Sequence, residues 1–277
     1  MPAMKISLLS NRSSFLSFGL ALSFAFAPLA KAEDLTIAAA ASLQDALADM
    51  KADLERELPG TTVRVTAGAS GTLQQQIAQG APIDIFLSAA NRPIEELEKL
   101  KQLSPGSAKQ FLAGELVLIA PKASRLKSLN ELNSASVKRV AIGEPRSVPA
   151  GDYALQALTS LKLETALTPK FLYAKDVRQV LSYVERGEVE AGFVYKSDLE
   201  SVAGKSVRLV ETLPASSHKP IRYTMAVVAA SKKQESAKKI LNYFESQKAA
   251  VIWTKFGFNP LTEKSASVEK EKSSAPK

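Results

Sequence analysis

Two serines stand at matching places in the sequence, each directly after an apolar run and directly before a helical pattern. Ser42 follows the run 35–41 (LTIAAAA), and Ser70 follows the run 63–69 (VRVTAGA). A strand-to-helix turn of this kind exposes the serine hydroxyl, the first backbone N–H groups of the helix and the positive end of its dipole. Several such turns that meet in one place form a site for a small anion. The alternative is that each serine is a plain helix N-cap worth about 1 kcal/mol, and Asp45, three residues after Ser42, gives a weak capping-box pattern.

A third turn offers backbone donors rather than a side chain. Pro149 has a fixed φ and stands just before Ala150 and Gly151, which open a helical pattern with apolar residues on one face. Glycine lets another group approach the backbone closely, so the N–H groups of Ala150 and Gly151 are candidate ligand donors. A turn without a binding role is the alternative.

The next helix and the strand after it supply two more candidates. Asp176 is expected to cap the helix that begins at Val177, with Gln179 as its capping-box partner. A carboxylate would repel an anion, so the useful group in this turn is the N–H of Val177. Tyr195 ends the apolar run 191–195 (AGFVY), where its hydroxyl could overhang a cleft; a buried tyrosine with a purely structural role is the alternative.

Other chemistries lack the residues that they need. His218 is the one histidine, in a polar loop with no nucleophile elbow near it, and the chain has no cysteine. The segment 68–72 (GASGT) lacks the lysine of a phosphate loop, and no GxGxxG occurs. Transition-metal binding would need a cluster of His or Cys, and nucleic-acid binding would need a basic stripe with aromatic residues. The sequence therefore predicts no catalytic residues, no cofactor and no nucleic-acid partner.

The elements that must position these residues alternate between strand and helix. The first half gives a doubly wound α/β pattern with strands that are apolar on both faces. A strand at 116–121 interrupts the pattern and a second set of units follows, which predicts two α/β lobes with ligand between them at the carboxyl ends of the strands. We expect lobe I at 33–113 and 220–261 and lobe II at 114–219, joined by two crossover segments. The expected strands are 35–40, 62–67, 83–89, 116–121, 138–142, 170–174, 191–196, 207–210 and 221–229, and the expected helices are 43–58, 71–79, 93–102, 151–161, 177–186 and 233–246.

The two ends of the chain have compositions of their own. Residues 1–32 read as a secretory signal peptide, with Lys5 and Arg12 before an uncharged apolar core and a small-x-small cleavage pattern at 30–32. Export to a bacterial periplasm is expected, without a lipid anchor because no cysteine follows the cleavage site. Removal of three basic residues with the signal leaves the formal net charge three units below the +8 of the whole chain. Residues 262–277 are rich in Lys, Glu and Ser, and we expect them to be disordered.

Together these turns resemble the family of periplasmic molybdate-binding proteins that serve ATP-dependent importers, over residues 35–260. The residues that carry the resemblance are 39–43 (AAASL), 69–73 (ASGTL), 80–89 (GAPIDIFLSA), 148–151 (VPAG), 176–178 (DVR) and 193–195 (FVY). The resemblance implies the two-lobed fold of type II periplasmic binding proteins. One departure is Gly71, which stands where many members have a second serine.

The resemblance also implies a site and a function. The family holds a tetrahedral oxyanion through two serines, two backbone N–H groups and a tyrosine hydroxyl, which match Ser42, Ser70, Ala150, Val177 and Tyr195; these residues would hold the metal as molybdate, through its oxygens. The implied protein is a monomer and not an enzyme, which captures molybdate or tungstate and delivers it to a membrane permease. Two alternatives stay open, namely a binding protein for sulfate or ferric ion and an enzyme built on the same two-lobed fold.

Overall fold

The computed structural model describes residues 33–201 and 203–261, and these fall within one compact unit. The predicted signal peptide (1–32) and the predicted disordered tail (262–277) lie outside the described residues. The fold is α/β with two sheets, which confirms the predicted fold class. No helix in the described part of the chain is long and apolar enough to cross a membrane.

The first sheet has six strands in the order β11-β4-β10-β3-β1-β2. Strand β1 is parallel to β2 and β3, whereas β10 runs antiparallel to both β3 and β4. Side chains alternate between the two faces of β1, so that Leu35, Ile37 and Ala39 join one apolar cluster and Ala38 joins another. Both faces of this sheet are therefore buried. The strands are β1 (Glu33–Ala40), β2 (Thr61–Gly68), β3 (Ile85–Ser88), β4 (Lys109–Ala113), β10 (Arg222–Val227) and β11 (Asn259–Pro260).

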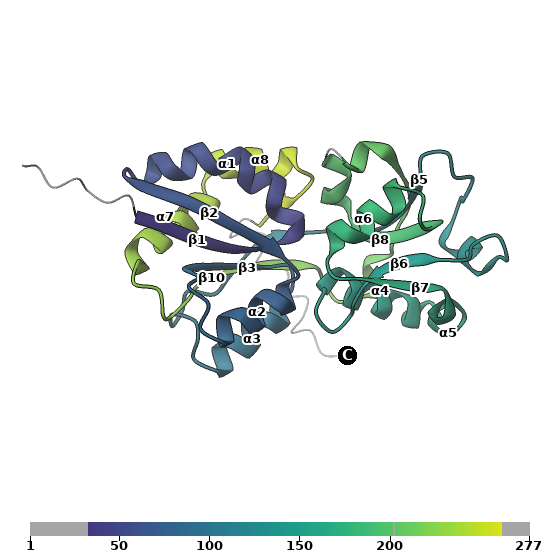
Figure 1. Cartoon of the computed structure of the whole chain (residues 1–277), viewed down its shortest axis with the longest axis horizontal. Coiled ribbons are helices and arrows are strands. Elements are labelled where there is room, and N and C mark those ends of the chain that lie inside the picture. The colour runs from purple at the N-terminus through teal and green to yellow at the C-terminus, as the bar shows by residue number, and fades with distance from the viewer. Residues whose placement is uncertain (1–32, 202, 262–277) are drawn as a thin grey trace, which may run out of the picture. The chain divides into compact units, whose positions relative to one another are not determined.

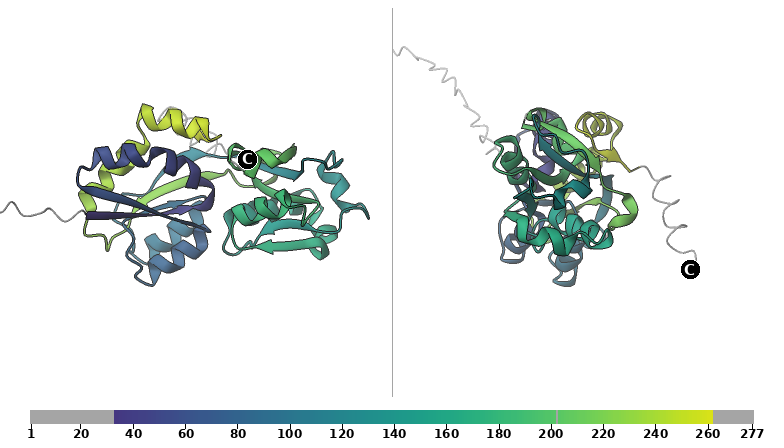
Figure 2. Two further views of the ribbon diagram at one scale, coloured as in Figure 1. Left: turned by 45° about the horizontal axis from the view of Figure 1, so that its top comes forward. Right: turned by 90° about the vertical axis from the view of Figure 1, so that its right-hand side faces the viewer.

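Helices cover both faces of the first sheet. Figures 1 and 2 show α1, α7 and α8 gathered on one face, and α2 and α3 together on the other. Leu47, Met50 and Leu54 of α1 are buried at one-turn spacing toward the sheet, which is the amphipathic pattern expected of a covering helix. The helices are α1 (Gln44–Glu57), α2 (Ser70–Ala78), α3 (Asn91–Lys99), α7 (Gln234–Phe244) and α8 (Gln247–Lys255).

The second sheet has five strands in the order β7-β6-β8-β5-β9. Strand β6 is parallel to β7 and β8, and β5 is antiparallel to β8 and β9. Helices α4 and α6 lie on opposite faces of this sheet in Figure 1. The elements are β5 (Leu116–Pro121), β6 (Val140–Gly143), β7 (Phe171–Ala174), β8 (Ala191–Tyr195), β9 (Val207–Thr212), α4 (Pro149–Ser160), α5 (Glu164–Leu167) and α6 (Val177–Glu185).

Close backbone contact fixes where α4 starts. A Cβ added at Gly151 would overlap the carbonyl of Gly143 at the end of β6, so only glycine allows this approach. The sequence suggested that Gly151 leaves room for a ligand, but the space beside Gly151 is occupied by the carbonyl of Gly143 on the neighbouring strand β6. Six short 3-10 helices complete the described chain: η1 (Ala41–Leu43), η2 (Leu129–Asn133), η3 (Thr168–Lys170), η4 (Lys196–Glu200), η5 (Ala203–Ser206) and η6 (Ala215–Ser217).

Several predicted elements differ in detail. The predicted helix 233–246 is followed by a separate helix, α8, whose N-cap Ser246 accepts a hydrogen bond from the Ala249 N–H at 3.2 Å. Strand β4 was not predicted, and β3 is shorter than its predicted range. The chain leaves the first sheet between β4 and β5 and returns to it at β10. The residue boundaries of the two lobes stay a prediction.

Candidate functional site

A small cavity lies where strands of both sheets end. Its free volume is about 10 Å³, close to the roughly 10–15 Å³ that is needed to hold one water molecule. Strands β1 and β2 end at it from the first sheet and β8 ends at it from the second, with their carboxyl ends toward the cavity, as expected for an α/β ligand site. The lining residues are Ala40, Ala41, Ser42, Gly68, Ala69, Ser70, Ala89, Val148, Pro149, Ala150, Val177 and Tyr195.

The five residues that match the site of the molybdate-binding family all line this one cavity. They come from five separate turns, and the fold brings them together although up to 153 positions separate them in the sequence. The prediction for Gly151 is wrong, because Gly151 does not line the cavity and its N–H donates to the Val148 carbonyl at 2.9 Å. None of the described residues that line the cavity is charged. Whatever binds here therefore meets hydroxyl and backbone groups rather than ions.

Neither cavity serine caps a helix. Ser42 lies within η1, where the helix N-cap is Ala40 and no side chain caps it; Ser42 Oγ lies 3.0 Å from the hydroxyl of Tyr223. Ser70 is the first residue of α2, and its Oγ accepts a hydrogen bond from the Ala89 N–H at 3.0 Å. Both side chains are buried. The N-cap alternative is therefore wrong for both serines, since their hydroxyls make tertiary contacts beside the cavity.

The backbone donors sit at helix starts. Ala150 is the second residue of α4, behind Pro149, and Val177 is the first residue of α6. N–H groups at these positions have no intrahelical acceptor. The predicted cap is confirmed, because the Asp176 side chain accepts from the Gln179 N–H at 2.8 Å. The Gln179 side chain accepts from the N–H of Lys175 at 2.7 Å, one residue before the predicted partner.

Tyr195 has a buried hydroxyl without a hydrogen-bond partner among the described residues. Its backbone N–H is held by the Asp198 carboxylate at 2.9 Å, which fixes the end of β8. Burial raises the pKa of the Tyr195 hydroxyl well above its usual value, so the group stays protonated and can donate. A buried polar group left unpaired costs about 1–3 kcal/mol. An acceptor in the cavity would remove that cost.

One cation lies behind the cavity. The Arg178 guanidinium is 2.9 Å from Asp45 Oδ2 and 3.0 Å from Asp198 Oδ1, and it donates to the Ser42 carbonyl at 3.2 Å. Asp198 is fully buried, and burial raises the pKa of its carboxyl to about 6 although Arg178 opposes the shift. Arg178 thus connects the chain around Ser42 to the end of β8. This role of Arg178 was not predicted from the sequence, where the only indication was that Arg178 directly follows the candidate donor Val177.

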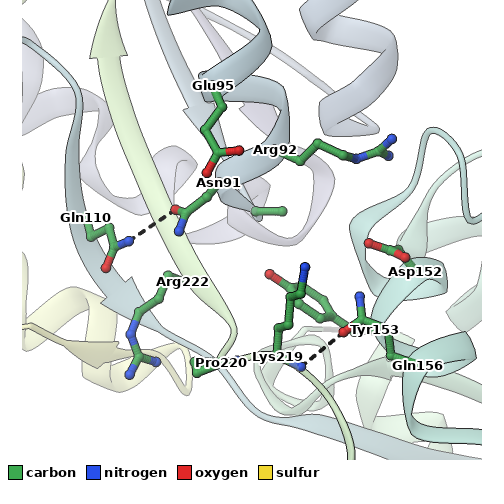
Figure 3. Close-up of a pocket in the computed structure, with 11 residues that line it drawn as sticks. Asn91, Arg92, Glu95, Gln110, Asp152, Tyr153, Gln156, Lys219, Pro220 and Arg222 are labelled. Atoms are coloured by element: carbon green, nitrogen blue, oxygen red, sulfur yellow. Dashed lines mark hydrogen bonds between the residues drawn. The ribbon is translucent and has the colours of Figure 1, made fainter. Parts of the chain in front are cut away.

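A larger groove elsewhere has a different chemical character (Figure 3). Its volume is about 610 Å³, and its lining mixes three cations, Arg92, Lys219 and Arg222, with the carboxylates of Glu95 and Asp152. Its amides are already engaged: Gln110 donates to Asn91 Oδ1 at 3.2 Å, and Gln156 accepts from the Lys219 N–H at 3.0 Å. Glu95 and Asp152 would compete with a dianion for these cations, whereas the smaller cavity presents only neutral groups. The smaller cavity is therefore the better candidate despite its size. In the described ranges no group of three or more His, Cys, Asp or Glu could hold a metal ion.

Comparisons with known proteins point the same way as the geometry. Residues 35–259 match the family model described as bacterial extracellular solute-binding protein. The chain is 39% identical over 224 residues to the putative ABC transporter substrate-binding lipoprotein YvgL of Bacillus subtilis, which covers 81% of this chain and 85% of that protein. It is 38% identical over 248 residues to the molybdate-binding protein ModA of Escherichia coli, covering 87% of this chain and 95% of that protein.

A solved structure of a molybdate-binding protein is also similar to this chain. The periplasmic molybdate-binding protein of Azotobacter vinelandii superposes with a TM-score of 0.74 at 25% identity, covering 82% of this chain and all of that one.

Proposed function

The chain belongs to the family of bacterial extracellular solute-binding proteins, and we propose that it captures molybdate in the small cavity and delivers it to the permease of an ABC importer. The observation that carries the proposal is the convergence of five hydrogen-bond donors on one cavity without charged residues. These donors are the hydroxyls of Ser42, Ser70 and Tyr195 and the N–H groups of Ala150 and Val177.

The chemistry of the anion suits this set of donors. Molybdate at neutral pH is a dianion without a proton, so it can only accept hydrogen bonds, and hydroxyl and N–H groups can all donate. Hydrogen phosphate carries a proton that would need an acceptor, which a donor-only site lacks. Sulfate has the same charge with shorter bonds, and tungstate has nearly the size of molybdate. We therefore propose that tungstate also binds and that sulfate and phosphate bind much more weakly.

In the proposed function the anion is bound between two lobes and is not chemically changed. We place lobe I at 33–113 and 220–261 and lobe II at 114–219, so that Ser42 and Ser70 approach the anion from one lobe and Ala150, Val177 and Tyr195 from the other. The relatives' names support a transport role, and we propose that the protein is a monomer and not an enzyme. We also propose that it is exported to the periplasm without a lipid anchor, since its 277 residues include no cysteine.

A thermal-shift series with four anions tests the proposal. A ligand at 100 times its Kd adds about 2.7 kcal/mol to the free energy of unfolding, and each kcal/mol raises the Tm of a protein of this size by about 2–4 °C. We expect clear increases with micromolar molybdate and tungstate and none with equal sulfate or phosphate. Equal shifts with sulfate and molybdate would make the protein a general oxyanion binder. A shift with phosphate alone would refute a donor-only site.

A further inference from the structure

Each cavity serine has a polar partner within the protein. For Ser70 that partner is the N–H of Ala89, at 3.0 Å from Oγ. An N–H group can only donate, so it occupies a lone pair of the Ser70 oxygen. The single hydroxyl proton of Ser70 is thereby left for another acceptor, and the cavity is where an acceptor would be bound.

For Ser42 the partner is the hydroxyl of Tyr223, on strand β10, at 3.0 Å from Ser42 Oγ. Two hydroxyls share this contact, and either oxygen could supply the proton. The Ser197 hydroxyl is also close to that of Tyr223; if it donates to the Tyr223 oxygen, the Tyr223 proton is left for Ser42. If Ser42 donated to Tyr223, Ser42 would turn its lone pairs toward the cavity and repel an anion. If Tyr223 donates, Ser42 keeps its proton for the anion, as Ser70 does.

We propose that Tyr223 is a positioning residue, which donates its proton to Ser42 Oγ and so directs the Ser42 hydroxyl proton onto the bound oxyanion. The inference rests on the proposed function, because it requires a ligand that only accepts hydrogen bonds. Tyr223 itself does not line the cavity, so it acts through Ser42. Its hydroxyl does for Ser42 what a fixed backbone N–H does for Ser70.

The surroundings of Tyr223 hold it in that role. The residue is 0% exposed, and burial raises the pKa of its hydroxyl well above the usual value, so the proton to be donated is always present. Its ring packs edge-on against the rings of Tyr195 at 5.7 Å and Phe258 at 5.3 Å between centroids. These contacts leave the phenol little freedom to turn away from Ser42.

Calorimetric titration of five variants with sodium molybdate tests the inference, namely Tyr223→Phe, Ser42→Ala, Ser70→Ala and each serine variant combined with Tyr223→Phe. Tyr223→Phe removes the hydroxyl and keeps the ring, and we expect it to weaken binding by about three- to tenfold, the range for one neutral hydrogen bond. In a Ser42→Ala background the same change should cost less than about twofold, because the residue through which Tyr223 acts is gone. In a Ser70→Ala background it should cost as much as in the wild type, since Tyr223 makes no contact with Ser70. Wild-type affinity in Tyr223→Phe, or an equal loss in both serine backgrounds, would overturn the inference.

Two controls keep the result interpretable. Tyr243→Phe removes another buried hydroxyl, one that donates to Asp53 Oδ2 at 2.9 Å away from the cavity, and it should leave molybdate affinity unchanged. If Tyr223→Phe does not fold, 3-fluorotyrosine at position 223 keeps the ring and makes its hydroxyl a stronger donor; tighter molybdate binding is expected, and unchanged or weaker binding would overturn the inference. Absence of binding by the wild type would refute the proposed function and with it this inference, whereas wild-type binding with an unaffected Tyr223→Phe refutes the inference alone.

Discussion

Ser70→Ala should lower both the stability of the protein and its affinity for molybdate, for two separable reasons. Ser70 is 0% exposed, and its Oγ is the acceptor for the Ala89 N–H at 3.0 Å. Alanine leaves that N–H buried and unpaired, which costs about 1–3 kcal/mol of the free energy of unfolding. In a protein of this size we expect a decrease in Tm of about 2–4 °C for each kcal/mol.

The loss of affinity has its own magnitude. In the proposed site the Ser70 hydroxyl donates to a dianion, and a hydrogen bond to a charged group contributes about 1.5–3 kcal/mol. Its removal should raise the Kd for molybdate by about ten- to hundredfold, at about 1.4 kcal/mol for each factor of ten. Urea unfolding without ligand measures the first effect, and calorimetric titration of the folded variant measures the second.

Ser107→Ala is the matched control. Ser107 Oγ also accepts a hydrogen bond from a backbone N–H, that of Val227 at 3.1 Å, but the residue does not line the cavity. It should therefore reduce stability and leave the affinity unchanged. If Ser70→Ala bound molybdate like the wild type, or if both variants lost affinity to the same extent, Ser70 would not be a ligand and the reasoning from its position would be wrong.

Three further predictions concern groups around the cavity. Arg178→Gln removes the cation that contacts Asp45, Asp198 and the Ser42 carbonyl, and titration should show at least tenfold weaker molybdate binding; unchanged affinity would mean that this cation does not order the site. Burial raises the pKa of Asp198 to about 6 from 3.8, so the folded state binds more protons in that range and the contribution of Asp198 to stability is lost as the pH rises through about 6. Asp198→Asn should therefore make the slope of the unfolding free energy against pH more positive between pH 3.8 and about 6. If urea unfolding gave the same slope for the variant and the wild type, the raised pKa of Asp198 would be contradicted. Gly71→Ala would place a Cβ 2.8 Å from the backbone of Ser147. Gly71 belongs to the proposed lobe I and Ser147 to the proposed lobe II, so this overlap would oppose closure of the lobes around the anion. Since relieving such overlap costs about 1–3 kcal/mol, the Kd for molybdate should rise by about five- to hundredfold, and an unchanged Kd would show that the two backbones can move apart at little cost.

The five candidate residues could be found from the sequence because their positions follow from general rules. Ser42 and Ser70 each follow an apolar strand, and parallel strands in one sheet end at the same edge. Val177 follows an aspartate cap, and Ala150 follows a proline at a helix start. Local signals thus located the donors, although the distances between them could not be predicted from the sequence.

Contacts between residues far apart in the sequence could not be predicted. Tyr223 lies in an apolar run, and nothing near it in the sequence indicates that its hydroxyl meets Ser42, 181 positions away. Arg178 read as one charge on a helix, yet it reaches Asp45, 133 positions away. Helix α8 was missed because the Gly and Pro signals that mark helix ends elsewhere are lacking at the short break after Phe244.

The reason for glycine at position 71 also depends on a contact between distant parts of the chain. The resemblance to the molybdate-binding family implied only that glycine stands where many members have a second serine, which does not explain why glycine is needed there. In the structure its N–H donates to the Ser147 carbonyl at 2.9 Å, and the Ser147 backbone fills the space that a side chain would need. Glycine at this position therefore serves a close backbone contact between the first turn of α2 and the turn before α4.

A site made of neutral donors explains how tight binding and release could both be achieved. A cavity lined by lysine or arginine would attract any anion, whereas fixed N–H groups and hydroxyls with directed protons favour an anion that accepts from every side. In the proposed arrangement the two serines lie on one lobe and the other three donors lie on the other. Each hydrogen bond to the dianion contributes about 1.5–3 kcal/mol, so separation of the lobes removes enough of them to lower the affinity by orders of magnitude. Opening at the permease would then release the anion without any change in protonation or charge.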